Sequence, residues 1–242
     1  DGRYIALVST SGEAFLYDLL ADKKLATVSV PGWIEWTEPS PLGDYLLINF
    51  GGGGDGPQSG LEAYNPQTGV KVGKVATGHG HGSVALAPDG SQWYVYTTFD
   101  NYVGVFGPYV TKARIPRGYD DWKSGDKTGL VALLELDWGA SLHVSCLAHN
   151  SEWCAVSTYA MTNTNVPFYH EVFRLNLNST LQSPKVQRLV HHRSDRNLPA
   201  SCGMSSYWAD PHASVSRDGK QIIFGSSWGQ VCRAEAYIIN VS

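Results

Sequence analysis

A strand–turn–strand pattern near the end of the sequence constrains the fold most, because the chain repeats it. Residues 212–216 and 221–226 are rich in β-branched and aromatic side chains, which predicts two strands. Arg217, Asp218 and Gly219 lie between them. An Asp-Gly pair supplies the left-handed backbone conformation that a tight hairpin turn needs. The segment is therefore predicted to be a β-hairpin.

Equivalent turns recur at Asp1, Gly43, Asp89 and Asn150. With the turn at Asp218 they define five units of strand, turn, strand, loop and strand. A period of roughly 40–50 residues is typical of a β-propeller, whose blades are four-stranded antiparallel sheets. A β-sandwich gives no reason for one hairpin to recur at this interval. We predict an all-β propeller with five visible blades.

We expect residues 1–242 to form a single propeller domain that is truncated at its N-terminus. The first unit begins inside its hairpin at Asp1-Gly2 and lacks its first strand, so the first blade is incomplete. This favours a ring of six or seven blades, with the missing ones before Asp1; a closed five-bladed ring is the alternative. Two segments are expected to be loops: the glycine-rich residues 51–56, and a long insertion at 100–128. The predicted strands are 4–8, 13–18, 24–30, 34–38, 45–50, 61–64, 70–75, 83–87, 92–98, 130–136, 143–148, 153–159, 171–176, 186–191, 212–216, 221–226 and 235–241.

Charge and hydropathy exclude two classes of partner. The chain has 18 Lys and Arg residues against 22 Asp and Glu, a net charge of −4. This balance provides no basic surface for nucleic acid. The longest apolar runs, such as residues 130–136, are far shorter than the roughly 18 residues that a membrane-spanning helix needs. We therefore expect neither nucleic-acid binding nor membrane insertion.

The four cysteines have no CxxC or zinc-finger spacing. Cys146 and Cys154 flank a predicted turn, and Cys202 and Cys232 lie in loops around the last hairpin. Two disulfides, Cys146–Cys154 and Cys202–Cys232, are one interpretation, and four small buried thiols are the other. Disulfides, together with the glycosylation sequons at Asn178 and Asn240, favour an extracytoplasmic protein, secreted or periplasmic.

Three hairpins resemble a known repeat. APDGSQWYVYTT (87–98), SRDGKQIIFGSS (216–227) and DGRYIALVST (1–10) look like the WD40-like repeat of TolB-type propellers. The resemblance covers most of the chain. It implies the fold, which binding proteins and enzymes share, and no particular activity.

Aligning the five turns brings polar residues to one end of the predicted channel, the mouth formed by loops that enter the innermost strands. Equivalent positions are held by Trp36, Ser83, Val144 and His212. Just before these positions lie Glu35, His79, His81, His143 and Asp210. Imidazole and carboxylate together suit Zn²⁺ or Mn²⁺. The alternative is that each histidine bonds to a neighbouring blade or faces solvent.

One segment sharpens the metal hypothesis. Tyr207–Ser214, YWADPHAS, is similar to the metal-binding segment of oligogalacturonate lyases, approximately Q-x-x-H-P-H-P-S. The resemblance implies that His212 is a ligand, while Asp210 stands where the family has histidine and Tyr207 where it has glutamine. His79 or His81 would supply a further ligand. His191, His192 and Arg193 are candidates for the base and the cationic groups that such a lyase needs.

Aromatic residues in predicted loops favour a different function. They are Trp33, Trp36, Tyr109, Tyr119, Trp122, Tyr207, Trp208 and Trp228. Exposed rings bind sugars or partner side chains, although blades also pack on aromatics. Trp36, Tyr119, Trp122, Tyr207 and Trp208 are the candidate ligand-binding residues, and Tyr119 and Trp122 lie beside Arg117 and Lys123 in the insertion.

The sequence therefore favours a binding or scaffold module that recognises a glycan or a protein through the mouth. A metal-assisted polysaccharide lyase, or a related carbohydrate-active enzyme, is the alternative. No nucleophile elbow, zincin helix, Rossmann glycine pattern or haem motif occurs, and no catalytic set is complete. No cofactor is required by the sequence; a divalent metal ion belongs to the enzyme hypothesis alone.

Overall fold

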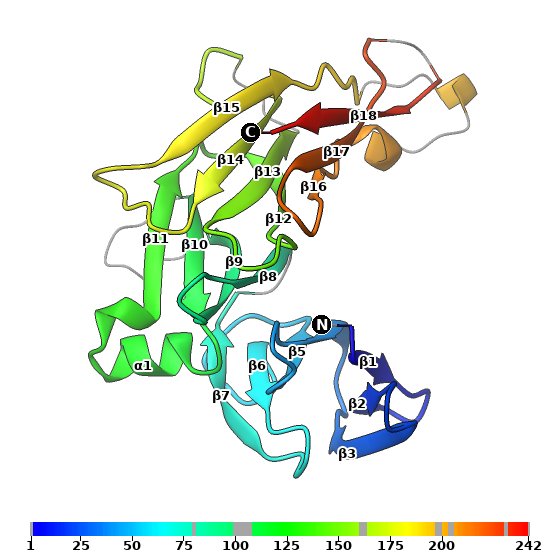
Figure 1. Cartoon of the computed structure of the whole chain (residues 1–242), viewed down its shortest axis with the longest axis vertical. Coiled ribbons are helices and arrows are strands. Elements are labelled where there is room, and N and C mark those ends of the chain that lie inside the picture. Colours follow the sequence, from blue (N-terminus) through cyan, green and yellow to red (C-terminus); the bar gives the residue numbers. More distant parts are fainter. Residues whose placement is uncertain are drawn as a thin grey trace. The chain divides into compact units, whose positions relative to one another are not determined.

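The computed structural model describes residues 2–78, 81–98, 108–159, 164–196, 200–202, 206–229 and 232–241 (Figure 1). In these residues the chain forms five antiparallel sheets of three or four strands, and one short α-helix. The recurrent sheets that the turn spacing predicts are confirmed. No helix in the described residues is long and apolar enough to span a membrane.

The first sheet has three strands, β1 (Tyr4–Val8), β2 (Glu13–Asp18) and β3 (Lys23–Ser29). The second has β4 (Ile34–Pro39), β5 (Leu46–Phe50), β6 (Gly60–Tyr64) and β7 (Lys71–Ala76). The third has β8 (Gly82–Leu86), β9 (Gln92–Thr98), β10 (Tyr109–Arg114) and β11 (Leu130–Glu135). In each sheet the strands lie side by side in sequence order.

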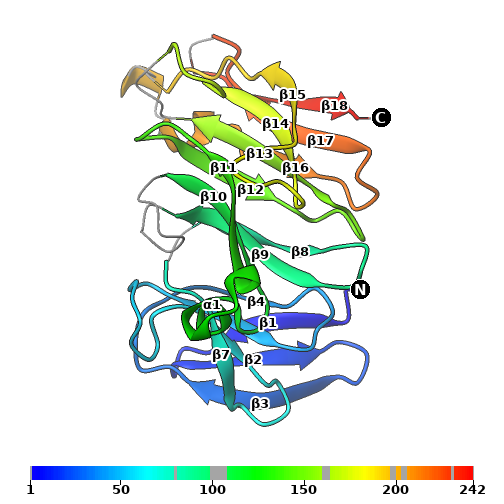
Figure 2. The same cartoon turned by 90° about the vertical axis from the view of Figure 1, so that its left-hand side faces the viewer.

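The fourth sheet has β12 (Ser141–Ser145), β13 (Trp153–Tyr159), β14 (Glu171–Asn176) and β15 (Val186–His191), which Figure 2 shows side by side. The fifth has three strands, β16 (Ser214–Val215), β17 (Gln221–Ser226) and β18 (Glu235–Asn240). The remaining elements are helix α1 (Gly118–Ser124) and the 3₁₀ turns η1 (Lys127–Gly129), η2 (Ala200–Cys202) and η3 (Ser206–Ala209).

One residue in each predicted turn has a positive φ angle. Gly2, Gly43, Gly90, Asn150 and Gly219 have φ angles of 76°, 77°, 81°, 50° and 73°. Glycine adopts this left-handed region without steric cost, and asparagine tolerates it better than most residues. The repeat in the sequence is thus a repeat of one backbone conformation.

The expectation that residues 100–128 form an insertion loop is wrong in part. Residues 109–114 form β10, and residues 118–124 form α1. The flanking Gly, Pro and charged residues hide a strand whose Tyr109 and Val110 are buried. The helix ends at Gly125, whose φ of 115° is a left-handed cap. Residues 100–107 lie outside the described part of the chain.

The chain divides into two compact units. Unit 1 comprises Asp1–Gly80, Gly90–Tyr94 and Lys112–Val131, and unit 2 comprises His81–Asp89, Val95–Thr111 and Ala132–Ser242. The third sheet contributes residues to both. The core of unit 1 includes Ala14, Leu16, Val28, Val30, Leu46, Ile48, Phe50 and Tyr64. A core of unit 2 is formed by Ala148, Ala155, Val172, Ala213, Val215, Ile222, Phe224 and Val241. A single domain and the number of blades in the native ring stay predictions.

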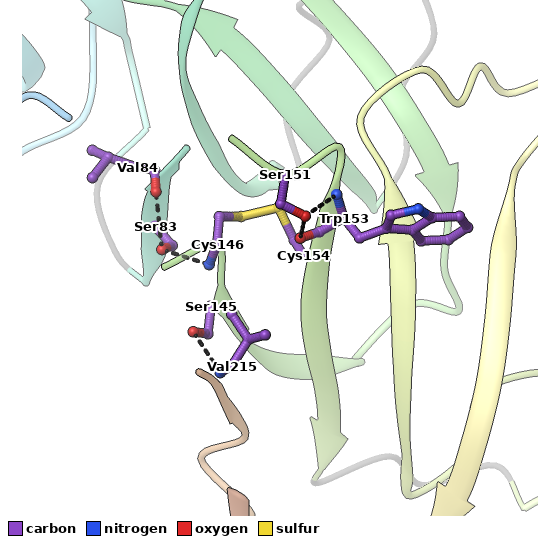
Figure 3. The surroundings of a disulfide bond; sticks show 8 residues. All are labelled: Ser83, Val84, Ser145, Cys146, Ser151, Trp153, Cys154 and Val215. Atoms are coloured by element: carbon purple, nitrogen blue, oxygen red, sulfur yellow. Dashed lines mark hydrogen bonds between the residues drawn. A yellow bond between two sulfur atoms is a disulfide. The ribbon is translucent and has the colours of Figure 1, made fainter. Parts of the chain in front are cut away.

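Serine hydroxyls connect neighbouring sheets within unit 2. The Ser83 hydroxyl on β8 accepts a hydrogen bond of 2.9 Å from the backbone N–H of Cys146. The Ser145 hydroxyl on β12 accepts one of 3.1 Å from the N–H of Val215 on β16 (Figure 3). These two hydrogen bonds link the first strand of the third sheet to that of the fourth, and the first strand of the fourth sheet to that of the fifth.

Both predicted disulfides are present. Cys146 pairs with Cys154 across the turn between β12 and β13, with their Cα atoms 4.3 Å apart (Figure 3). Cys202 pairs with Cys232, with a Cα separation of 4.8 Å. Cys146 and Cys154 are buried, whereas Cys232 is exposed.

Candidate functional site

Six rings gather in unit 2 near the starts of the first strands of three sheets. His81 directly precedes β8, His143 lies on β12, and His212 lies two residues before β16. Tyr159 ends β13, and Tyr207 and Trp208 lie on η3. The strands β8, β12 and β16 are neighbours, so residues near their starts converge although they are far apart in sequence. We refer to these six residues as the ring cluster.

His143 is the centre of the ring cluster. Its ring centroid lies 3.9 Å from that of His212, 4.7 Å from that of Tyr159 and 5.2 Å from that of His81. The His143 and Tyr159 rings are nearly parallel, at 20°, whereas His81 meets His143 edge-on at 76°. His143 is 9% exposed.

The ring cluster continues outward to the protein surface. The centroid of Tyr207 lies 4.8 Å from that of His212, and the centroid of Trp208 lies 5.4 Å from that of Tyr207. Tyr207 is 46% exposed and Trp208 is 63% exposed. A continuous series of rings thus leads from an exposed indole to a buried imidazole.

Buried imidazole nitrogens in the ring cluster have no protein partner. Among the described residues, neither Nδ1 nor Nε2 of His143 has a hydrogen-bond partner, and neither does Nε2 of His212. Burial, together with the charges of the neighbouring His212, His81 and Arg196, lowers the pKa of His143 to about 3. His143 is therefore neutral at pH 7. Unpaired buried nitrogens are uncommon and costly, so they point to a bound group.

An ion pair between half-buried Arg196 and buried Asp210 borders the ring cluster. Arg196 Nε lies 2.8 Å from Asp210 Oδ1, and Asp210 is 3% exposed. The Arg196 guanidinium also lies 5.2 Å from the Tyr159 ring centroid. Burial raises the pKa of Asp210, which the charges of Arg196 and His212 counteract. Asp210, an expected metal ligand, thus pairs with an arginine.

The backbone holds His212 in a strained conformation. Its φ is 41°, in the left-handed region that few histidines occupy. The adjacent Ala213 N–H donates 3.1 Å to the Ser157 hydroxyl, and the Gly225 N–H donates 2.7 Å to the Pro211 carbonyl. Strain of this kind persists where surrounding contacts enforce it, and it is frequent at functional sites.

The predicted metal ligands are only partly brought together. His81 and His212 both contact His143, Asp210 contacts Arg196, and His79 lies outside the described residues. Over the described ranges, no group of three His, Cys, Asp or Glu side chains could hold a metal ion. Aligning the turns placed His143 at the mouth but did not identify its central position. Tyr159 and Arg196 gave no sequence signal.

The predicted aromatic residues lie in different units. Trp36, in unit 1, is half-buried and packs 5.6 Å from the ring of Tyr94. Tyr119 is buried, donates a hydrogen bond to Asp55 and stacks 6.0 Å from half-buried Trp122, leaving its ring no open face for a ligand. Tyr207 and Trp208 alone of the five belong to the ring cluster.

The candidates for a lyase base and cation make other contacts. His192 is buried; its Nδ1 accepts a hydrogen bond of 3.0 Å from the Ser194 N–H, so its Nε2–H donates 2.8 Å to the Thr158 carbonyl. His191 Nε2 lies 3.5 Å from Glu171, and the Arg193 guanidinium lies 5.6 Å from the Trp228 ring centroid.

Comparison with solved structures shows a β-propeller. An oligogalacturonate lyase from Vibrio parahaemolyticus matches with a TM-score of 0.56 and 14% identity, over 95% of this chain and 55% of that one. A putative TolB from Agrobacterium tumefaciens gives 0.51 and 14%, over 90% and 61%. A complex of KlAtg21 with the coiled-coil of AgAtg16 gives 0.53 and 7%, over 99% and 64%.

These likenesses establish the predicted fold class and the TolB-like resemblance, and no ligand. The chain spans between about half and two thirds of the length of the three structures. No protein-family model and no curated protein matches the sequence.

Proposed function

We propose that unit 2 is a carbohydrate-binding module and that the ring cluster is its binding site. The observation that carries this proposal is the exposed Trp208–Tyr207 pair, which leads to imidazole nitrogens without partners. Apolar ring faces combined with a few convergent polar groups are typical of small-ligand sites. Two disulfides agree with an oxidising, extracytoplasmic compartment, where a glycan ligand would be met.

Each part of the site has a distinct role. The Trp208 indole offers an open face for stacking against the apolar face of a sugar ring. His212 Nε2 either donates or accepts a hydrogen bond to a hydroxyl group, according to its tautomer. The Arg196–Asp210 pair keeps a charged donor and acceptor beside Tyr159.

Glycan-array screening tests the proposal. Trp208→Ala removes the exposed indole and is expected to weaken binding of any array ligand about tenfold or more, which corresponds to at least ~1.4 kcal/mol. Trp138→Ala is the matched control, because Trp138 is an exposed tryptophan of unit 2 outside the ring cluster. Equal losses for the two variants, or no ligand on the array, would contradict the proposal.

A metal-assisted polysaccharide lyase is the second candidate. The partnerless nitrogens of His143 and His212 favour it, since neutral imidazole is a good ligand for transition metals. The fit is incomplete, because structural and catalytic metal sites use three or more protein ligands, and the described residues do not supply them. We therefore derive no catalytic step through a metal.

Elemental analysis of protein purified without chelator separates the two candidates. A near-stoichiometric transition metal in the wild type, lost in His212→Ala, would favour the lyase, and acidic polysaccharides would then be screened for new unsaturated ends. Absence of metal from both proteins would remove the lyase and leave the binding module.

A further inference from the structure

One face of the fifth sheet is apolar and exposed. Ser214 on β16 pairs with Ile223 on β17, and Ile223 pairs with Ile238 on β18. Cross-strand partners point to the same face of a sheet, so these three side chains form one row across the three strands. Ile223 is 47% exposed and Ile238 is 60% exposed. All three residues line a hollow on this face. We refer to them as the outer row.

The other face of the fifth sheet packs against the fourth sheet. Ile222 and Phe224 of β17 are buried in a core that they share with Ala155 and Val172 of the fourth sheet. Because successive residues of a strand point to opposite faces, Ile223 faces away from that core. Single exposed apolar residues are common on protein surfaces, whereas neighbouring ones in a hollow are more typical of an interface. The outer row is therefore a candidate contact surface.

A serine on the first strand marks each contact between consecutive sheets of unit 2. The Ser83 hydroxyl accepts from the Cys146 N–H, and the Ser145 hydroxyl accepts from the Val215 N–H. In the fourth sheet the accepting serine, Ser145, directly precedes the donor, Cys146. In the fifth sheet the residue that directly precedes the donor, Val215, is Ser214. Ser214 is therefore the next acceptor in the series.

Ser214 differs from the other two serines in its surroundings. Ser83 and Ser145 are 8% and 6% exposed, whereas Ser214 is only half-buried. Within the described residues, the Ser214 hydroxyl makes no hydrogen bond. It lies in the same row as Ile223 and Ile238. An apolar face alone would suit many partners, but an acceptor at this position of the series selects a partner that brings a main-chain N–H group.

The first sheet of a second copy of this chain does not supply that donor. It has exposed apolar residues on β1, since Ile5 is 40% exposed and Leu7 is 39% exposed. The donors Cys146 and Val215, however, lie before the turn of their hairpin. In the described residues, the first sheet consists of β1, β2 and β3, and all three follow the turn at Gly2. The partner of the outer row needs a strand before its turn.

We propose that the outer row docks a further four-stranded blade of the same polypeptide, whose first strand donates an N–H group to the Ser214 hydroxyl. Propellers repeat about four to eight blades around one channel, so a contact between consecutive blades recurs around the ring. The serine contacts link sheets that are consecutive in the chain, which assigns the partner to the same polypeptide. This proposal does not rest on the ring cluster.

Thiol labelling of the native protein, expressed from its complete reading frame, tests the docking. Ile238→Cys and Ile223→Cys each place one free thiol on the outer row, because the native cysteines are paired in disulfides. Trp138→Cys is the matched control, since Trp138 is 51% exposed in the same unit and lies outside the row. Both row variants are expected to react with a maleimide at least about tenfold more slowly than the control, because the docked blade blocks access to the thiol. Equal rates would overturn the proposal.

The role of Ser214 is tested in the same assay. Adding Ser214→Ala to Ile238→Cys is expected to speed labelling about threefold, because docking then loses one hydrogen bond. An unchanged rate would overturn the role assigned to this serine.

Photo-crosslinking identifies what covers the row. Benzoylphenylalanine replaces Ile238 in the same full-length protein, and mass spectrometry identifies the crosslinked peptide. A peptide of the same polypeptide, from a sheet outside residues 1–242, would support the proposal. A crosslink to residues 4–8, to a second copy or to another protein would overturn it, and so would the absence of any crosslink.

Discussion

At the scale of single residues, the histidines of unit 2 show how position decides chemistry. His143 is 9% exposed and, within the described residues, neither of its ring nitrogens has a hydrogen-bond partner, whereas His192 is 1% exposed and both of its ring nitrogens are hydrogen-bonded. Both appear in the sequence as a histidine in or after an apolar strand. The difference arises from the Thr158 carbonyl and the Ser194 N–H, which only the folded chain brings together.

His192 makes stability sensitive to acid. Its pKa is lowered to about 4: burial is the main cause, the hydrogen bond to the Thr158 carbonyl opposes it, and the neighbouring His170 and His191 add to it. A histidine in the unfolded chain has a pKa of ~6.5, so between pH ~6.5 and 4 the unfolded chain binds a proton at this residue that the folded chain does not bind. Stability is therefore full above pH ~6.5 and falls as the pH drops towards 4.

The expected slope is about 1.4 kcal/mol per pH unit. His192→Gln removes this titration, so its free energy of unfolding should fall about 2 kcal/mol less than that of the wild type between pH 7 and 5. Urea unfolding at the two pH values measures both slopes. Parallel slopes would show that His192 does not contribute to acid sensitivity.

At the scale of elements, strand predictions succeed where turns and apolar runs agree. The predicted bounds of β13, β14, β15 and β17 coincide with the observed ones. Strand β10, YVTKAR, was missed because it lies among glycine, proline and charged residues that resemble a loop. Tyr119 was interpreted as exposed, since no local pattern reveals that Asp55, 64 positions away, accepts its hydrogen bond.

The glycine-rich loop gives the sharpest test at this scale. Lys74 is buried, and its ammonium group donates hydrogen bonds to the carbonyls of Gly54, Gly56 and Ser59. Lys74→Met removes these hydrogen bonds and is expected to cost about 2–3 kcal/mol, while amide exchange in residues 51–60 accelerates. Lys71→Met is the control: Lys71 and Lys74 both pair with Glu62, at 2.6 Å and 3.5 Å, but Lys71 is exposed and, in the described residues, donates to none of these carbonyls. Hydrogen exchange that rises equally in both variants would contradict the role of Lys74 in holding the loop.

At the scale of the whole molecule, the recurrence of one turn predicts the architecture, but not the site. Each of the five turns contains one glycine or asparagine with a positive φ angle, and these turns define the sheets from local sequence alone. The ring cluster needs the order of β8, β12 and β16 in space, and its outer rings come from η3, which has no strand pattern. His212 could be identified from the alignment of the turns and from the segment YWADPHAS, whereas Arg196 has no such pattern around it.

The two disulfides should respond differently to reductant in the native protein. Thiol–disulfide exchange needs access to a sulfur atom, and Cys232 is exposed while Cys146 and Cys154 are buried. Mild reduction followed by alkylation and mass spectrometry is expected to label Cys202 and Cys232 well before the other pair. Labelling of all four at one rate would mean that unit 2 opens before either bond is reduced.

The serine hydrogen bonds of unit 2 have a consequence for how the site can evolve. Ser145 and Ser157 bind the N–H groups of Val215 and Ala213, which are main-chain atoms on the C-terminal side of His212. These hydrogen bonds do not depend on the side chain of the residue whose N–H group donates. The side chain at position 212 can therefore change without loss of these two hydrogen bonds, which leaves the ring cluster free to vary at this position while the neighbouring strands stay linked.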